Sequence, residues 1–415
     1  MKIKFNTIYR IVLLAMLFSA LEPTGFIGTI VHTLCGAVRM GGFYLSIALI
    51  FYLFFSGKTK RMTEVLLFSF VIMFALSTLF YSKTINDTCA YFVRNTIVVI
   101  VSLKFLYMID PYKACRDVGI MLTVFLIFDA MTFFLPGLGV SGSDSNIITC
   151  FLGTKTTITY YMMPTLMFDY VYLKICRQHE KKLALIILVT AVLATVAYLV
   201  QIMISTALIS LALSIILMVL TERNSVIVTK LAKLGPPIAS AVSALIVAGS
   251  SLPIFTYFIT EVLHESADLD GRGPLWEMAL SYIRVNPIFG YGLSTGVYLS
   301  SWQEKNESAH NLFLGIILHA GVVGFLVFAG IIVYLCVVNI KTRGINHMMC
   351  CFLVGMLTII LVEGIAEDFI NNTVTFCAFS IMGNARLFIP AEERIKQLAN
   401  VKEKRTRVLP ARCQE

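Results

Sequence analysis

Two side chains in the longest polar segment of this 415-residue chain could carry out charge-dependent chemistry. His310 stands at the end of that segment. An imidazole titrates near neutral pH, so it can take a proton from a hydroxyl group as the hydroxyl reacts. Arg272 stands near the middle, just before Pro274, and proline suits the first turn of a helix. A guanidinium beside a helix N-terminus favours anions, and its planar fork pairs with two phosphate oxygens.

Other cations are further candidates for an anion-binding role. Arg284 lies on the expected polar face of the helix that Pro274 begins. Arg94, Arg39 and Lys155 lie near the ends of long apolar runs. Each also has a structural interpretation, because a cation on a polar helix face or beside lipid headgroups is common without any catalytic role.

Acidic residues gather at the end of another apolar run. Glu363 lies within the run, and Glu367 and Asp368 follow it. Acids inside a membrane are costly and often functional, so Glu363 is a candidate for substrate binding. Glu367 and Asp368 are also compatible with an exposed loop. Asp129 and Asp169 lie deep in apolar runs without an obvious partner in the sequence.

The composition predicts an all-α membrane protein with many spans. Apolar residues make up 58% of the chain and charged residues 14%, and the mean hydropathy is +0.84. Soluble domains are about 45–50% apolar and about 25% charged. The net charge of +9 therefore indicates cytoplasmic loops near anionic lipid rather than nucleic acid. The ten cysteines form no CxxC pair and have no metal-ligand spacing with histidine, so we expect no metal site.

Apolar runs of about 20 residues, the length of one membrane span, predict twelve transmembrane helices. The candidate spans are 8–30, 40–56, 62–80, 90–109, 117–135, 156–175, 182–200, 204–221, 236–258, 310–340, 347–369 and 372–389. The run from Leu183 to Leu220 is too long for one span and must turn near Gln201–Ser205. We expect no cleavable signal peptide, because the first apolar run has no small-residue cleavage site followed by a polar region.

The basic residues predict the orientation of these spans. With the N-terminus in the cytoplasm, 25 of the 33 basic residues fall on the cytoplasmic side, and the C-terminus lies there too. The chain then divides into nine spans (1–258), one large extracytoplasmic loop (259–309), three spans (310–389) and a basic cytoplasmic tail (390–415). The candidate residues gather at the outer face of a plasma membrane.

The large loop predicts an amphipathic helix on the membrane surface. Apolar residues fall on one face at positions i, i+3, i+4 and i+7, from Trp276 to Ile283, and Asn286-Pro287 ends the helix. Trp276 is interpreted as an interfacial anchor. Ser308 is a plausible N-cap for the next span, which places His310 in the first helical turn and His319 on the opposite face.

An ordered set of short motifs in this region resembles a known family. The motifs are Gly271-Arg272, Trp276, Asn286-Pro287-Ile-Phe-Gly290-Tyr-Gly292, His310-Asn311-Leu-Phe-Leu and Gly321-Val-Val-Gly324. Together they resemble the O-antigen ligase and Wzy-type polysaccharide polymerase family. The segment Phe151-Leu-Gly-Thr-Lys-Thr-Thr also resembles the polymerase branch.

The resemblance implies an all-helical glycosyltransferase, similar to GT-C enzymes, that uses a polyprenyl-diphosphate-linked sugar without a metal or cofactor. By position, Arg272 would hold the diphosphate, and His310 would be the base, with Asn311 beside it as a substrate-binding residue. Many members carry a Ser-Arg pair where this chain reads Ser205-Thr206. A second cation would then come from Arg284, Arg94, Arg39 or Lys155.

Three functions remain open from the sequence. The preferred one is a polymerase that joins lipid-linked repeat units of a capsule or O-antigen. A ligase that moves a finished glycan to another acceptor belongs to the same family. A transporter of lipid-linked sugars belongs to another class and should show charges or broken helices at mid-membrane depth. The expected partners are the lipid-linked oligosaccharide, the bilayer and other membrane proteins of polysaccharide assembly, with no nucleic acid.

Overall fold

The structure is a computed structural model of the whole chain. The residues that it describes are 2–23, 29–55, 62–134, 140–141, 148–154, 156–249, 272–293, 299–301, 304–306, 309–342, 346–370 and 372–388.

Helices make up most of the described residues, as the composition predicts. The first half contains α1 (Lys2–Ala20), α2 (Thr29–Phe55), α3 (Met62–Ser82), α4 (Asp87–Ile109), α5 (Pro111–Phe134), α6 (Thr157–Ile175) and the 3-10 turn η1 (Gln178–Glu180). The second half contains α7 (Lys181–Ile202), α8 (Ser205–Glu222), α9 (Val226–Gly249), α11 (Arg272–Val285), α12 (Leu312–Ile340), α13 (His347–Glu363), α14 (Thr375–Gly383) and η3 (Ala385–Leu387).

Seven of the described helices are long and apolar enough to cross a membrane. They are α2, α3, α4, α7 with the turn before it, α8, α9 and α12. The chain is therefore a multi-pass membrane protein. The expected turn between the seventh and eighth spans is confirmed, because α7 ends at Ile202, Met203 takes a left-handed conformation and α8 begins at Ser205. The total of twelve spans and their orientation remain predictions.

The first two predicted spans have the wrong boundaries. The run 8–30 was expected to form one helix, but α1 ends at Ala20 and α2 begins at Thr29. Pro23 explains the break, since proline lacks an N–H and disfavours a helical conformation in the residue before it. That residue, Glu22, is buried and forms an ion pair with Arg39 of α2.

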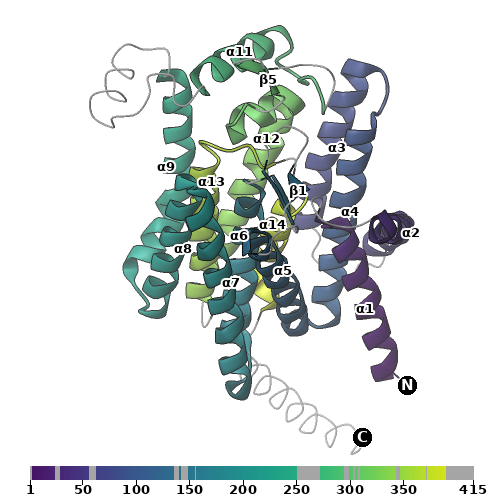
Figure 1. Ribbon diagram of the computed structural model, residues 1–415, viewed down its shortest axis with the longest axis vertical. Coiled ribbons are helices and arrows are strands. Elements are labelled where there is room, and N and C mark those ends of the chain that lie inside the picture. The colour runs from purple at the N-terminus through teal and green to yellow at the C-terminus, as the bar shows by residue number, and fades with distance from the viewer. Residues whose placement is uncertain are drawn as a thin grey trace, which may run out of the picture.

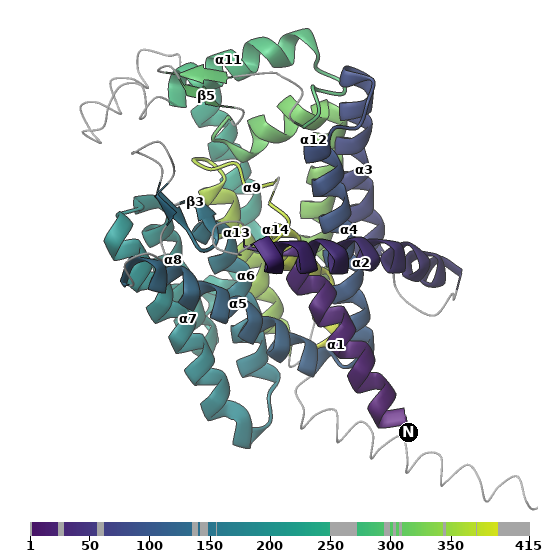
Figure 2. The same cartoon turned by 45° about the vertical axis from the view of Figure 1, so that its right-hand side comes forward.

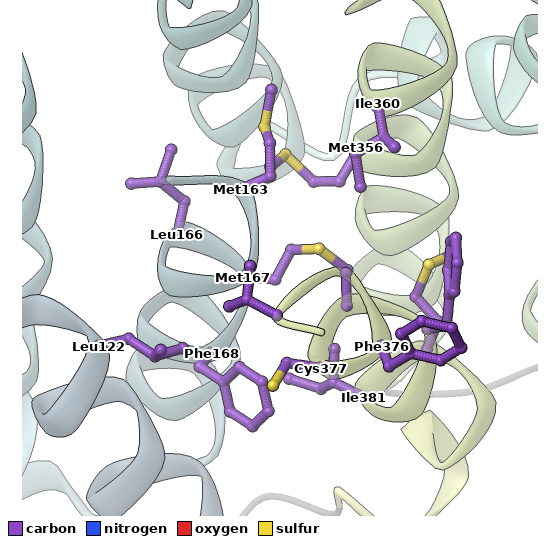
Figure 3. Packing of buried hydrophobic residues seen from close by; sticks show 14 of the residues in the cluster. Leu122, Met163, Leu166, Met167, Phe168, Met356, Ile360, Phe376, Cys377 and Ile381 are labelled. Atoms are coloured by element: carbon purple, nitrogen blue, oxygen red, sulfur yellow. The ribbon is translucent and has the colours of Figure 1, made fainter. Parts of the chain in front are cut away.

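The last predicted span, 372–389, is also wrong in its length. Its helix, α14, has only nine residues, about 13 Å at 1.5 Å per residue, against a hydrocarbon core of about 30 Å. The helix lies in the protein core instead. Figure 3 shows Phe376, Cys377 and Ile381 of α14 packed among side chains of α6 and α13, with Leu122 of α5 nearby.

Two short antiparallel sheets are the part of the fold that the all-helical prediction missed. One joins β1 (Val140–Ser141), β2 (Ile148–Cys150) and β3 (Gly153–Thr154). The other joins β4 (Leu299–Ser301) and β5 (Glu304–Asn306). Each sheet lies in one of the two longest loops that the sequence predicts to be outside the membrane. Strands of two or three residues are too short for the alternation of apolar and polar residues to reveal.

The helices define a long axis with the candidate loop at one end. Helix α11 lies at one end of this axis, above α9 and α12, and the N-terminal end of α1 points toward the other end (Figures 1 and 2). Helices α3 and α4 run along the axis. Helix α2 runs across it, and is seen nearly end-on in Figure 1 and from the side in Figure 2.

Candidate active site

The outer loop is fixed to α12 at a break in that helix. Gly321 has φ 66° and ψ −174°, which interrupts the helical hydrogen bonds and leaves backbone groups on both sides without helical partners. The turn from Pro287 to Gly292 supplies the missing partners. Four backbone hydrogen bonds of 2.8–3.3 Å run from Tyr291 N to Leu318 O, from Gly292 N to His319 O, from Val322 N to Pro287 O and from Val323 N to Ile288 O.

Glycine is required where these two backbones meet. A Cβ on Gly321 would lie 2.0 Å from the carbonyl oxygen of Ile288, and one on Gly290 would lie 2.6 Å from that of Leu318. Both glycines also have positive φ angles, which other residues rarely adopt. These glycines therefore let the backbone of the turn lie directly against the backbone of α12.

His319 belongs to this junction. Its side chain is buried, and its Nδ1 lies 2.7 Å from the carbonyl oxygen of Gly292. The same turn continues to Leu293, whose N–H donates to Thr78 Oγ1 and whose carbonyl accepts from Asn86 Nδ2. The turn therefore ties α12 to α3 and α4, and His319 holds the loop in place.

Helix α11 confirms the predicted amphipathic helix and brings Arg272 to the start of α12. Trp276 is 2% exposed, and its indole Nε1 donates to the carbonyl oxygen of Ala309, 3.0 Å away. The interpretation of Trp276 as an interfacial anchor is thus wrong, because the ring lies in an apolar cluster beneath the helix. Arg272 is the first residue of α11 and lies one turn before Trp276. Because Trp276 is hydrogen-bonded to Ala309, this end of α11 lies next to the residue that precedes His310.

The start of α12 differs from the prediction. The helix begins at Leu312, and its cap is Asn311, whose side chain accepts from the N–H groups of Phe313 and Leu314. Ser308 lies outside the described residues. His310 therefore precedes the helix instead of lying in its first turn, and it has a positive φ of 44°. Asn311 is fully buried and also donates to the carbonyl oxygen of Ile365, so its side chain fixes the site's backbone.

His310 faces the acidic residues that follow α13. Its Nδ1 lies 3.9 Å from Glu367 Oε2. The histidine side chain is 36% exposed and that of Glu367 is 7% exposed. Leu312 N donates to Gly364 O at 2.7 Å, which holds this turn against the start of α12. The arrangement places a partly exposed imidazole next to a buried carboxylate, at a separation longer than a hydrogen bond.

Two more acids lie beneath this pair. Asp368 packs against α12 where Gly315 leaves room, since a Cβ there would lie 2.1 Å from Asp368 Oδ2. The pKa of the Asp368 carboxyl is raised to about 7, chiefly by burial and to a smaller extent by the nearby Glu367, while the Ile370 backbone N–H and His310 act in the opposite direction. Glu363 is buried and lines a cavity of about 10 Å³ with Tyr160, enough for about one water molecule. The sequence noted all three acids, and the structure places Glu367 and Asp368 beside His310, with Glu363 next to Glu367.

The other candidate cations do not form one group with Arg272. Arg284 is exposed in the last turn of α11, about 18 Å along the helix from Arg272. Arg94 and Arg39 both stack on the ring of Tyr91, where α2 meets α4. Lys155 lies outside the described residues.

The two deep acids have partners that the sequence could not reveal. Asp129 Oδ1 accepts a hydrogen bond from Leu152 N at 2.8 Å, which ties the three-stranded sheet to α5. Asp169 Oδ2 accepts from Thr123 Oγ1 at 2.8 Å, which joins α6 to α5. Each contact joins two separate elements of the fold, so these acids have structural roles.

Comparison with known families now bears on this geometry. Residues 147–329 match the family described as O-antigen ligase. This segment belongs to the O-antigen ligase family. It includes Arg272, the turn that binds the α12 break, and His310, and it ends before the acids beyond α13. No curated protein matches the chain. The match supports a role of the O-antigen ligase or polymerase type in polysaccharide assembly.

Three residues near the site escaped the sequence reasoning. Tyr160 lies beside the buried acids, Tyr91 stacks under two arginines, and Glu22 forms an ion pair with one of them. Aromatic residues are frequent in any apolar span, so neither tyrosine stands out. Glu22 did carry a signal, because an acid next to Pro23 interrupts the first apolar run.

Proposed function

We propose that the chain is a polymerase that joins lipid-diphosphate-linked oligosaccharide repeat units at the outer face of the plasma membrane. The observation that carries the proposal is the partly exposed imidazole of His310 with the buried Glu367 behind it, just before α12. Helix α11, which begins at Arg272, is held at this place by the hydrogen bond from Trp276 to Ala309. The family match supports the substrate class, a lipid-linked oligosaccharide.

The proposed step needs one base and charge neutralisation. A sugar hydroxyl of the acceptor attacks the anomeric carbon of the donor, and a new C–O bond forms as the bond from that carbon to the diphosphate breaks. The ring of His310, whose Nδ1 lies 3.9 Å from Glu367 Oε2, would take the hydroxyl proton. The electron pair of the broken bond leaves with the lipid diphosphate. Arg272 would stabilise that charge by paired contacts to phosphate oxygens, so the proposed mechanism requires no metal.

The experiment is deletion of the gene followed by gel analysis of the surface glycan. We expect single repeat units to accumulate on the lipid carrier, because chain growth stops while the units are still made and transported. Expression of the wild-type chain should restore long polymer.

A ligase is the second candidate, and the description of the matched family favours it. In that case deletion leaves full-length polymer on the carrier, unattached to its final acceptor. That pattern would contradict the polymerase proposal.

A further inference from the structure

A second group of charged residues lies where α2 meets α4. Arg39, which is 5% exposed, lies 3.3 Å from Glu22 Oε2 and donates to Tyr91 OH at 3.1 Å. The guanidinium carbon of Arg39 lies 5.0 Å from the centre of the Tyr91 ring, and that of Arg94 lies 5.8 Å away. Both are within the range of a cation–π contact. One aromatic ring therefore fixes two arginines, and we call these four residues the Tyr91 cluster.

The two arginines differ in how their charge is balanced. Arg39 has Glu22 as its counter-ion. Among the residues that the structure describes, Arg94 has no acidic partner: its Nη1 contacts the Met40 sulfur at 2.9 Å, and its buried Nε has no hydrogen-bond partner. A partly buried guanidinium without a counter-ion is costly. The geometry of Arg94 is thus suited to an anion that approaches from outside.

The surroundings of the Tyr91 cluster are open to lipid. Tyr91 and Met40 are both exposed to more than a third of their surface, and so are Leu34 and Val38 on α2. An anion that binds here meets apolar side chains next to the charge. This combination suits the phosphate of a lipid, whose oxygens would pair with Arg94 while its chains lie along α2.

The cluster also lies beside the proposed active site. Tyr161 OH donates to the carbonyl oxygen of Leu21, the residue before Glu22. The neighbouring Tyr160 packs its ring 6.1 Å from that of Phe369, the residue after Asp368. The first turns of α6 therefore separate the Tyr91 cluster from the acids behind His310.

This site is distinct from Arg272. Helix α2 lies well below α11 along the long axis in both views, which differ by a rotation about that axis (Figures 1 and 2). Arg94 and Arg272 accordingly do not form one clamp on a single phosphate group.

We propose that the Tyr91 cluster binds the diphosphate of a second lipid-linked oligosaccharide, the acceptor, while Arg272 holds that of the donor. The inference rests on the proposed polymerase function, because joining two lipid-linked units requires two lipid diphosphates at once. A ligase that uses another acceptor has no such need.

The test counts bound lipids by native mass spectrometry of the purified full chain with polyprenyl diphosphate as the probe. We expect two lipids on the wild-type chain. Arg94→Gln should bind one, with the second weakened at least about tenfold, as for loss of a hydrogen bond to a charged group. Arg272→Gln should lose the other. Arg94→Lys should keep the second lipid at reduced affinity, since it retains the charge without the fork. Arg177→Gln, which changes an exposed arginine between α6 and α7, should bind two.

Two results would overturn the inference. The first is wild-type binding by Arg94→Gln. The second is displacement of the Arg94-dependent lipid by an equal concentration of phosphatidylglycerol, which would identify a general phospholipid headgroup site. Lipid counting needs no turnover, so its outcome is separate from the proposed function. Two bound lipids without polymer would contradict the polymerase alone, and polymer with Arg94-independent binding would contradict this site alone.

Discussion

At the residue scale, the site combines the histidine that the sequence proposed as a base with an acid that only the structure places beside it. His310 and Arg272 could be selected from their residue types and their place in the large loop. Glu367 could not be paired with His310 from the sequence, because 57 positions separate them along the chain. The hydrogen bond from Leu312 N to Gly364 O brings the two segments together.

Replacement of His310 by glutamine should abolish most turnover. An amide keeps hydrogen-bonding capacity but takes no proton at neutral pH, so we expect a loss of roughly two to four orders of magnitude in rate with lipid binding retained. The measurement is the initial rate of glycan transfer by purified protein.

The matched control for this variant is His179→Gln, in the exposed turn between α6 and α7. His319→Gln would be the natural choice from the sequence, but His319 holds Gly292. A His310→Gln rate within a factor of two of wild type would rule out the base assignment.

Asp368→Asn should change how stability depends on pH. Burial raises the pKa of Asp368 to about 7 from an ordinary value of about 3.9, so the folded protein binds a proton that the unfolded chain releases between these values. The stability that this proton provides is complete below about pH 4 and is lost as the pH rises to about 7, on the order of 4 kcal/mol at most. Asparagine resembles the protonated acid, so the variant should lose less stability over this range in thermal unfolding in detergent. If the stability of the wild type and of the variant depended on pH in the same way, the claim that Asp368 is buried in its neutral form would be contradicted.

At the element scale, the motif glycines shape the joint between a loop and a broken helix. The spacing of apolar residues along the sequence predicted α11 with its apolar face, and the length of the apolar run predicted the α7–α8 turn. Both features are determined by local sequence. It did not predict the break in α12, since Gly321 lies in a run apolar enough for an unbroken span. The break depends on hydrogen bonds to Pro287–Gly292, a contact between segments that local sequence does not encode.

Gly321→Ala should release the outer loop from α12. The φ of 66° with ψ of −174° is a conformation that essentially only glycine adopts, and the added Cβ would meet Ile288 O at 2.0 Å. We expect a loss of at least about 2 kcal/mol in stability and a large loss of activity. Thermal unfolding and transfer rate measure these effects.

Gly330→Ala in the same helix is the control for the Gly321 variant. An added Cβ there has no atom within 4 Å, so the variant should behave like the wild type. Equal stability of the two variants would show that the break is not needed.

At the scale of the whole molecule, the arrangement is the one that the proposed outer-face chemistry requires. Helix α11 lies at one end of the long axis, and the N-terminal end of α1 points toward the other (Figure 1). Composition was enough to predict a multi-pass helical protein. It was not enough to recognise that α14 is a short core helix or that α2 crosses the axis, because a buried or transverse apolar helix has the same hydropathy as a span.

Cysteine labelling tests the orientation. A cysteine at Ser281, on the exposed face of α11, should react with a membrane-impermeant thiol reagent in intact cells that lack the native cysteines. One at Gln178, in the exposed turn between α6 and α7, should react only after the membrane is permeabilised. The reverse pattern would place the site in the cytoplasm.

The central claim is that one chain both binds lipid-linked repeat units and joins them, and reconstitution measures this directly. The purified chain in liposomes receives a single lipid-linked repeat unit as donor and acceptor, and the products are separated by size. We predict a ladder of multiples of the unit, with released lipid diphosphate equal to the number of new linkages, and no ladder with His310→Gln. Units that stay single with the wild-type chain, but are transferred when a different glycan acceptor is supplied, would contradict the polymerase and identify a ligase.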